Sequence, residues 1–144
     1  MTDPVEQAVD YFRQGFSCAQ AVCAAFAPGL GLDAESALRV AGAFGGGIAR
    51  QGALCGAAGG ALMALGLRYA PTQPDSAAKD HAYAQGREFL RRFRERCGAL
   101  NCRELLACDV SDPQELERAR QEGLFQSLCP QFVRSAAEIV AEML

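Results

Sequence analysis

An uncharged segment rich in glycine and alanine, residues 52–67, limits most strongly what this chain can fold into. Its sixteen residues fall short of the roughly twenty that a membrane-spanning helix needs. Because it is also nearly free of β-branched residues, a strand is disfavoured, and we expect a buried helix at the centre of the fold. Gly56, Gly60 and Ala64 lie four positions apart, so they form a stripe of small residues that another backbone can approach closely.

The segment that leads into this helix, residues 43–52, contains four glycines and no strand periodicity, so we expect a loop between two helices. One interpretation is a nest of backbone N–H groups for an anion or cofactor, with Gly45, Gly46, Gly47 and Gly56 as candidate cofactor-binding residues. The other is a connection rich in glycine because the helices pack tightly. No Lys-Ser or Lys-Thr pair follows the glycines, so the segment is not a phosphate-binding P-loop.

The rest of the chain carries apolar residues at helical spacing, and no segment alternates as a strand would. Helix starts are indicated by the capping residues Asp33, Asp75 and Asp112 and by Pro130. We expect a compact all-α bundle of about six to eight helices. The loops are expected at residues 28–33, 43–52 and 70–75. The length suits a single domain, residues 1–144.

Composition and charge exclude several classes of protein. Half of the residues are apolar, which is too many for a disordered chain, and a net charge of −3 is unlike the basic balance of a nucleic-acid-binding protein. The first ten residues are acidic and lack the basic and apolar regions of a secretory signal peptide. We therefore expect a cytoplasmic protein that neither spans a membrane nor binds nucleic acid.

Seven cysteines stand among the 144 residues, which is more than packing requires. Stable disulfides are rare in a reducing compartment, so this number favours a metal site or redox chemistry. Cys23, Cys97 and Cys108 lie away from the predicted helix starts, and we expect them to be packing residues. The other four stand at predicted helix N-termini: Cys18, Cys55, Cys102 and Cys129.

Local signals mark those four helix starts. Capping-box pairs precede or span two of the cysteines: Ser17 with Gln20 around Cys18, and Asn101 with Glu104 around Cys102. Cys55 follows the glycine loop, residues 43–52, and Cys129 precedes Pro130, a residue favoured in the first helical turn. A helix N-terminus carries about half a positive charge and unpaired N–H groups, so we expect it to lower the pKa of each thiol. Because thiolates are both nucleophiles and metal ligands, the four cysteines are candidate catalytic and metal-binding residues.

Four stretches carry a resemblance to a known family: FSCAQAV (16–22), AFGGGIARQGALCGAAGGALMALGL (43–67), NCRELL (101–106) and CPQFVRSAAEIV (129–140). They resemble the C_GCAxxG_C_C family of redox-active proteins, which has four characteristic cysteines and a CGAxxG motif. The resemblance identifies Cys55 as the motif cysteine, and Cys18, Cys102 and Cys129 as the other three. Leu54 replaces the glycine in the family label. Genes of this family often lie near transporter genes, which makes a membrane transport system a candidate partner.

Other residue types offer no competing site. His81 is the only histidine, and we expect it to be solvated on a helix rather than paired with a cysteine. Residues 86–97 hold five arginines opposite an apolar face, which indicates a solvated surface rather than a nucleic-acid interface. The carboxylates show no paired spacing, and no Ser-His-Asp arrangement predicts a hydrolase.

We expect the four cysteines to converge in one buried, electropositive pocket. If the four sulfur atoms lie close enough together to bind one metal centre, they would hold an iron–sulfur cluster or, alternatively, zinc. The function would then be electron transfer or metal binding. Two pairs at disulfide distance would instead give a thiol–disulfide oxidoreductase or redox sensor. A helical interaction protein with structural cysteines is the third hypothesis. We favour the cluster, because redox pairs more often sit close together in sequence. The sequence does not specify the redox partner. The small-residue stripe is also a candidate surface for self-association into a homo-oligomer.

Overall fold

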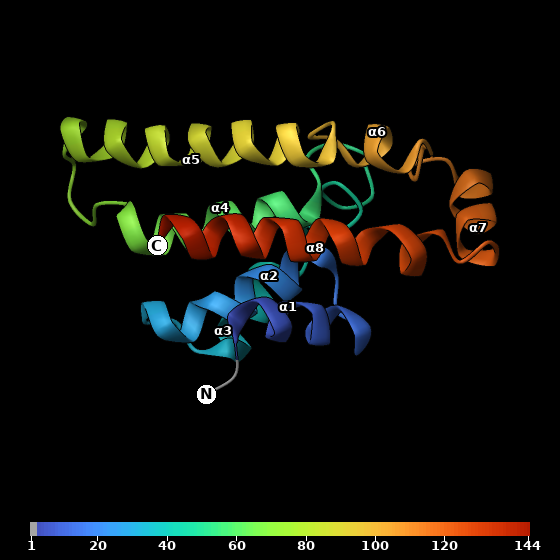
Figure 1. Cartoon of the computed structure of the whole chain (residues 1–144), viewed down its shortest axis with the longest axis horizontal. Coiled ribbons are helices and arrows are strands. Elements are labelled where there is room, and N and C mark those ends of the chain that lie inside the picture. The colour runs from blue at the N-terminus through green and yellow to red at the C-terminus, as the bar shows by residue number, and fades with distance from the viewer. Residues whose placement is uncertain (1–2) are drawn as a thin grey trace.

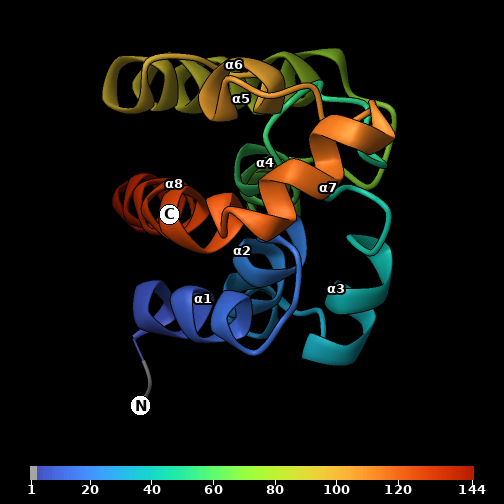
Figure 2. The same ribbon diagram turned by 90° about the vertical axis from the view of Figure 1, so that its right-hand side faces the viewer.

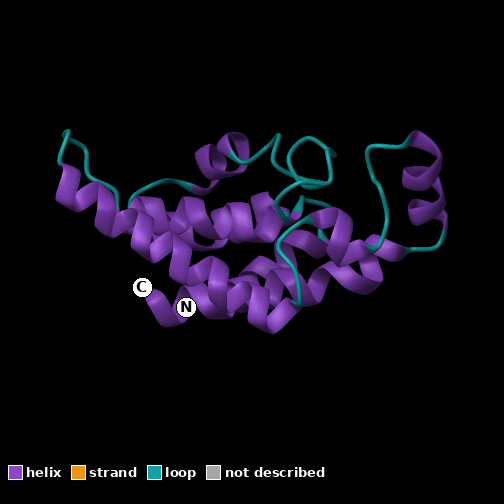
Figure 3. Cartoon of the chain, turned by 90° about the horizontal axis from the view of Figure 1, so that it is seen from above, coloured by secondary structure: helices purple, strands orange, loops and turns teal. Residues whose placement is uncertain are grey.

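Helices supply all the regular secondary structure of residues 3–144, the part of the chain that this computed structural model describes (Figure 3). They are α1 (Pro4–Arg13), α2 (Cys18–Phe26), the 3-10 helix η1 (Ala27–Leu30), α3 (Ala34–Val40), α4 (Gly56–Tyr69), α5 (Ser76–Cys97), α6 (Cys102–Leu106), α7 (Pro113–Gln121) and α8 (Leu124–Met143). The all-α prediction is confirmed, and the eight α-helices agree with the expected number. None of the described helices is long and apolar enough to cross a membrane.

The helices form three layers, with α5 and α6 on one side, α4 and α8 in the middle and α1 to α3 on the other side (Figures 1 and 2). Helix α7 lies at one end of the molecule, beside the start of α8. The layers enclose a core of fully buried side chains that includes Phe89 and Phe93 of α5 and Ile139 and Val140 of α8. The middle layer therefore has apolar neighbours on both of its faces.

Gly56 and Gly60 of the small-residue stripe of α4 face α2, so another backbone does approach the stripe closely, as predicted. A Cβ on Gly60 would come within 2.5 Å of the carbonyl oxygen of Ala19, and a Cβ on Gly56 within 3.0 Å of the Ala19 nitrogen. Each glycine in a helix interior costs about 1 kcal/mol relative to alanine. That cost is offset by the close contact between the two backbones, which no larger residue would allow.

Most predicted helix starts are confirmed by side-chain caps. Asp33, Asp75 and Asp112 are N-caps whose carboxylates accept backbone N–H hydrogen bonds, and Ser17 forms a capping box with Gln20. Asn101 stands at the N-cap of α6 but makes no side-chain cap hydrogen bond. The segment expected as a loop at 28–33 overlaps the 3-10 helix η1, so that boundary is wrong.

The expected helix start at Pro130 is wrong. Helix α8 begins at Leu124, after Gly123 in a left-handed conformation with φ of +66°, and Pro130 lies inside it. Leu124, Leu128 and Phe132 share one face of the helix at four-residue spacing and pack on the core, so their burial extends the helix backward. Cys129 therefore lies in the second turn rather than at the N-terminus.

The arginine-rich run of α5 lies on a solvated face, as predicted. Its arginines form exposed ion pairs, among them Arg91 with Glu88 at 2.7 Å and Arg96 with Glu138 at 3.4 Å. His81 is exposed on the same helix, where its ring contacts Tyr69 edge to face. Neither feature contributes to the cysteine site.

Candidate cysteine site

The structure brings the four candidate cysteines to one cavity of about 1050 Å³. They reach it from the starts of α2, α4 and α6 and from the second turn of α8: Cys18, Cys55, Cys102 and Cys129. Cys18 is partly exposed, whereas the other three are buried. The remaining cysteines do not line the cavity, and none of the seven forms a disulfide.

Backbone hydrogen bonds tie two of the cysteine segments together. The N–H of Cys55 donates to the carbonyl of Leu100 at 2.8 Å, and the N–H of Cys102 donates to the carbonyl of Ala53 at 2.7 Å. These bonds flank an isolated antiparallel bridge between Leu54 and Asn101. The starts of α4 and α6 are therefore held side by side, a pairing that no local pattern in the sequence indicates.

The glycine-rich loop before α4 makes a left-handed turn. Five consecutive residues have positive φ: Gly46 (+64°), Gly47 (+69°), Ile48 (+66°), Ala49 (+50°) and Arg50 (+60°). The left-handed conformation costs about 1–2 kcal/mol for each non-glycine residue, and it is least favourable for a β-branched one such as Ile48. The N–H groups of residues 48–53 donate to carbonyls of residues 43–48 within the same region. These N–H groups are therefore occupied within the loop, whereas the nest expected at Gly45, Gly46, Gly47 and Gly56 stays a prediction.

Close packing explains two of the glycines that we considered as cofactor-binding residues. All four, Gly45, Gly46, Gly47 and Gly56, line the cavity. A Cβ on Gly45 would come within 2.8 Å of the Ser17 Cβ, and one on Gly47 within 2.7 Å of the Cys102 Cβ. The tight-packing interpretation applies to Gly45 and Gly47, because glycine alone lets the loop approach the cysteine-bearing helix starts this closely. Cofactor binding by the four glycines stays a prediction.

Two thiols of the site, Cys18 and Cys129, shift each other's pKa. The interaction with the Cys18 side chain lowers the pKa of Cys129 despite its burial. The same interaction, together with burial, raises the pKa of Cys18 well above its ordinary value. Cys129 therefore loses its proton first, and Cys18 keeps the proton that stabilises the Cys129 thiolate.

The other two thiols resist ionisation. Burial raises the pKa of Cys55 to about 12, although the N–H groups of Ala57 and Ala58 lower it. Burial also raises the pKa of Cys102 to about 11. The expectation that helix N-termini lower all four thiol pKa values is wrong, because the interaction with Cys129, together with burial, raises the pKa of Cys18, and desolvation raises the pKa of Cys55 and Cys102. The lowered value belongs to Cys129, which does not stand at a helix start.

The four cysteine thiols are ligands that soft metals prefer, but their sulfur atoms are not placed close enough together to bind one. Within residues 3–144, no three side chains of His, Cys, Asp or Glu are placed together so that they could hold a metal ion. Four thiols would suit zinc or an iron–sulfur cluster if they moved closer. As the side chains stand, Cys18 and Cys129 are the two thiols of the site whose interaction dominates each other's pKa.

The three cysteines outside the cavity pack against other parts of the fold, as we expected from their positions. Cys23 is buried with the alanines of α2 and α3, and burial raises its pKa. The buried Cys108 thiol donates to the carbonyl of Glu115 at 3.7 Å. Cys97 ends α5, and burial raises its pKa despite a hydrogen bond with Ser135.

Sequence reasoning missed three arginines that line the cavity, Arg13, Arg50 and Arg120. No Asp or Glu stands among the described residues that line it. The expectation of an electropositive pocket rested on helix dipoles, whereas the structure supplies guanidinium groups. The position of Arg50 within the glycine loop was a sequence signal that could have identified it. Arg13 and Arg120 had none, since the contact of α1 and α7 with the cavity depends on how the helices pack.

A family model described as "Putative redox-active protein (C_GCAxxG_C_C)" matches residues 16–143. The chain belongs to this family. The resemblance carried by the four cysteines and the glycine motif is thereby confirmed. No curated protein and no solved structure matches the chain. The C_GCAxxG_C_C description supports redox activity and specifies no metal, substrate or mechanism.

Proposed function

We propose that this protein is a thiol–disulfide oxidoreductase whose reactive pair is Cys18 and Cys129. The observation that carries the proposal is that Cys18 and Cys129 line the same cavity, where their interaction lowers the pKa of Cys129. A thiolate is the species that attacks a disulfide, and a second thiol in contact with it can complete the exchange. The cavity gives a substrate access to the pair, since both residues line it.

The reaction proceeds in two exchanges. The Cys129 thiolate attacks one sulfur of a substrate disulfide, which breaks that bond, forms a mixed disulfide and releases the first substrate thiolate. Cys18 then loses its proton and attacks the Cys129 sulfur, which releases the second thiolate. Two protein thiols are oxidised to one disulfide while one substrate disulfide is reduced to two thiols, and the two protons pass to the products.

Peptide mapping after oxidation tests this assignment. The reduced protein is mixed with bis(2-hydroxyethyl) disulfide, alkylated, digested and analysed by mass spectrometry. We expect a Cys18–Cys129 disulfide in the wild type and a trapped mixed disulfide on Cys129 in Cys18→Ser. Cys97→Ser is the matched control, because Cys97 lies outside the cavity and its loss should change neither product. A disulfide between other cysteines, or unchanged oxidation of Cys129→Ser, would contradict the proposal.

A second candidate function is electron transfer or metal binding by all four cysteines. It is favoured by the arrival of four thiols at one cavity from four separate helices. Cys18, Cys55, Cys102 and Cys129 would be the ligands, and an iron–sulfur cluster or zinc would supply redox or structural chemistry there. Binding would require the thiols to move closer together than they stand.

Metal analysis separates the two candidates. The protein is purified without oxygen, and its visible absorption and its iron, sulfide and zinc contents are compared with those of Cys55→Ser. The metal candidate predicts stoichiometric metal in the wild type that is lost in the variant. The thiol–disulfide proposal predicts a metal-free protein whose Cys18–Cys129 oxidation survives the Cys55→Ser change.

A further inference from the structure

Positive charge gathers around the cysteine cavity although the chain as a whole is acidic. Three arginines line the cavity without a carboxylate among its described lining residues: Arg13, Arg50 and Arg120. Within residues 3–144, no carboxylate lies within 4.0 Å of Arg13 or Arg50, and only Glu117 approaches Arg120, at 3.8 Å. The charge of Arg13 contributes to lowering the pKa of Glu6, but the Glu6 carboxylate forms its ion pair with Arg134, at 2.7 Å from Oε1 to the guanidinium nitrogen. Two guanidinium groups at the cavity therefore have no acidic partner in the fold.

The strained loop holds one of these arginines in place. A Cβ on Gly46 would come within 2.6 Å of the Cγ of Arg50, so the Arg50 side chain lies directly over the glycine. Ile48, Ala49 and Arg50 all have positive φ, a conformation that persists in non-glycine residues only when the surroundings enforce it. The loop thus accepts backbone strain and presents Arg50 at the cavity.

We propose that the cavity takes a small organic disulfide that carries carboxylate groups. This inference rests on the proposed function, and it adds the chemical class of the substrate. Arginine binds carboxylate through paired hydrogen bonds, and unpaired guanidinium groups at a cavity attract an anion. Phenylalanines that line the same cavity offer apolar contacts to the carbon skeleton: Phe12, Phe16, Phe125 and Phe132. The cavity volume of about 1050 Å³ suits a small molecule.

Three disulfides that differ in charge provide the test. They are 3,3′-dithiodipropionate (anionic), bis(2-hydroxyethyl) disulfide (neutral) and cystamine (cationic). Each is mixed with the reduced protein in a single turnover, so that no added reductant is needed, and the release of thiol gives a second-order rate constant. Each constant is divided by that of dithiothreitol with the same disulfide, which removes the intrinsic reactivity of the compound.

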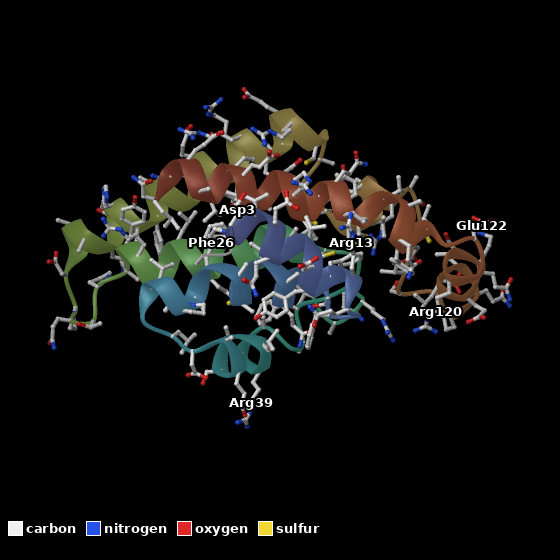
Figure 4. The ribbon with its side chains drawn as sticks, turned by 60° about the horizontal axis from the view of Figure 1, so that its bottom comes forward. Asp3, Arg13, Phe26, Arg39, Arg120 and Glu122 are labelled. Carbon is white, nitrogen blue, oxygen red and sulfur yellow. The ribbon has the colours of Figure 1, made fainter. Side chains whose placement is uncertain are left out.

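We expect the normalised rate for the anionic disulfide to exceed that for the cationic one by about tenfold or more at low ionic strength, and to fall with added salt. Arg50→Gln and Arg13→Gln should each lower this ratio. Arg13 ends α1, away from the strained loop, so its variant is informative even if Arg50→Gln unfolds. Arg39→Gln is the matched control, because Arg39 is exposed on α3 and does not line the cavity; Figure 4 shows it apart from Arg13 and Arg120.

The possible outcomes are distinct. Equal normalised rates for the three disulfides, or a ratio that the cavity arginines do not change, would overturn the substrate class while leaving the thiol–disulfide activity intact. Failure of the protein to reduce any of the three would instead overturn the proposed function. A charge preference that falls in Arg50→Gln and Arg13→Gln and persists in Arg39→Gln supports the inference.

Discussion

Gly60 of α4 lies against the carbonyl oxygen of Ala19 in α2, where a Cβ would come within 2.5 Å of that oxygen. Ala19 follows Cys18 at the start of α2, and Cys55 is the N-cap of α4. The contact between Gly60 and Ala19 therefore sets how closely the two cysteine-bearing helix starts approach each other. The small residues of α4 serve the geometry of the site as well as the packing of the core.

Gly60→Ala should destabilise the fold, because the added methyl group has no room beside the Ala19 carbonyl. Overpacking of this kind costs about 1–3 kcal/mol. Gly59→Ala is the matched control on the same helix, since no neighbouring atom lies within 4 Å of its Cβ position. We expect it to stabilise the protein by up to about 1 kcal/mol. Chemical denaturation measures both, and equal effects of the two substitutions would refute the packing argument.

The helices and their caps could be predicted from sequence because their signals are local. Asp33, Asp75 and Asp112 mark helix starts through hydrogen bonds to residues two or three positions later. The spacing of Gly56, Gly60 and Ala64 likewise depends on one helix alone. Each of these features is decided within a few residues of the chain, where periodicity and capping rules apply.

The thiol ionisation and the source of the cavity's positive charge could not be predicted, because both depend on tertiary contacts. The low pKa of Cys129 arises from Cys18, more than one hundred residues away in sequence. Pro130 gave a misleading signal, since the burial of Leu124 and Leu128 outweighs the preference of proline for a first helical turn. The left-handed turn that places Arg50 depends on close contacts between the loop and other helices, which no short motif encodes.

The thiolate of Cys129 should depend on its interaction with the Cys18 side chain. Cys18→Ala removes the thiol, so the pKa of Cys129 should rise, whereas Cys18→Ser retains a hydroxyl donor and should raise it less. The rate of iodoacetamide alkylation at Cys129, followed against pH by peptide mass spectrometry, gives the pKa in each protein. Identical pH profiles for wild type and Cys18→Ala would show that this interaction has no effect.

Stability should decline in mildly alkaline solution because of the buried thiols. A thiol with an ordinary pKa of 9.0 ionises in the unfolded chain, while Cys55, with a pKa of about 12, and Cys102, with a pKa of about 11, stay protonated in the folded protein. The unfolded state therefore binds fewer protons between these values, and the free energy of unfolding falls as pH rises. The contribution is fully present below about pH 9 and falls by about 1.4 kcal/mol per pH unit for each thiol above it, until the pH reaches about 11 for Cys102 and about 12 for Cys55.

The variant Cys55→Ala isolates one of these contributions. Its free energy of unfolding should fall less steeply than that of the wild type between about pH 9 and pH 11, because one titrating thiol is gone. Urea denaturation at a series of pH values measures both slopes. Parallel curves for the two proteins over this range would mean that Cys55 ionises equally in the folded and unfolded states.

The strain in the left-handed turn should be measurable at Ala49, which has φ of +50°. Ala49→Gly removes a conformational cost of about 1–2 kcal/mol in the folded state, while glycine adds about 0.4–1 kcal/mol of unfolded-state entropy. The net expectation is a stabilisation of up to about 1.5 kcal/mol. Ala70→Gly is the control, because Ala70 is also exposed but has φ of −71°, so only the entropic cost applies and the protein should be destabilised. Opposite signs in thermal or urea unfolding would verify the strain at Ala49, and destabilisation by both substitutions would refute it.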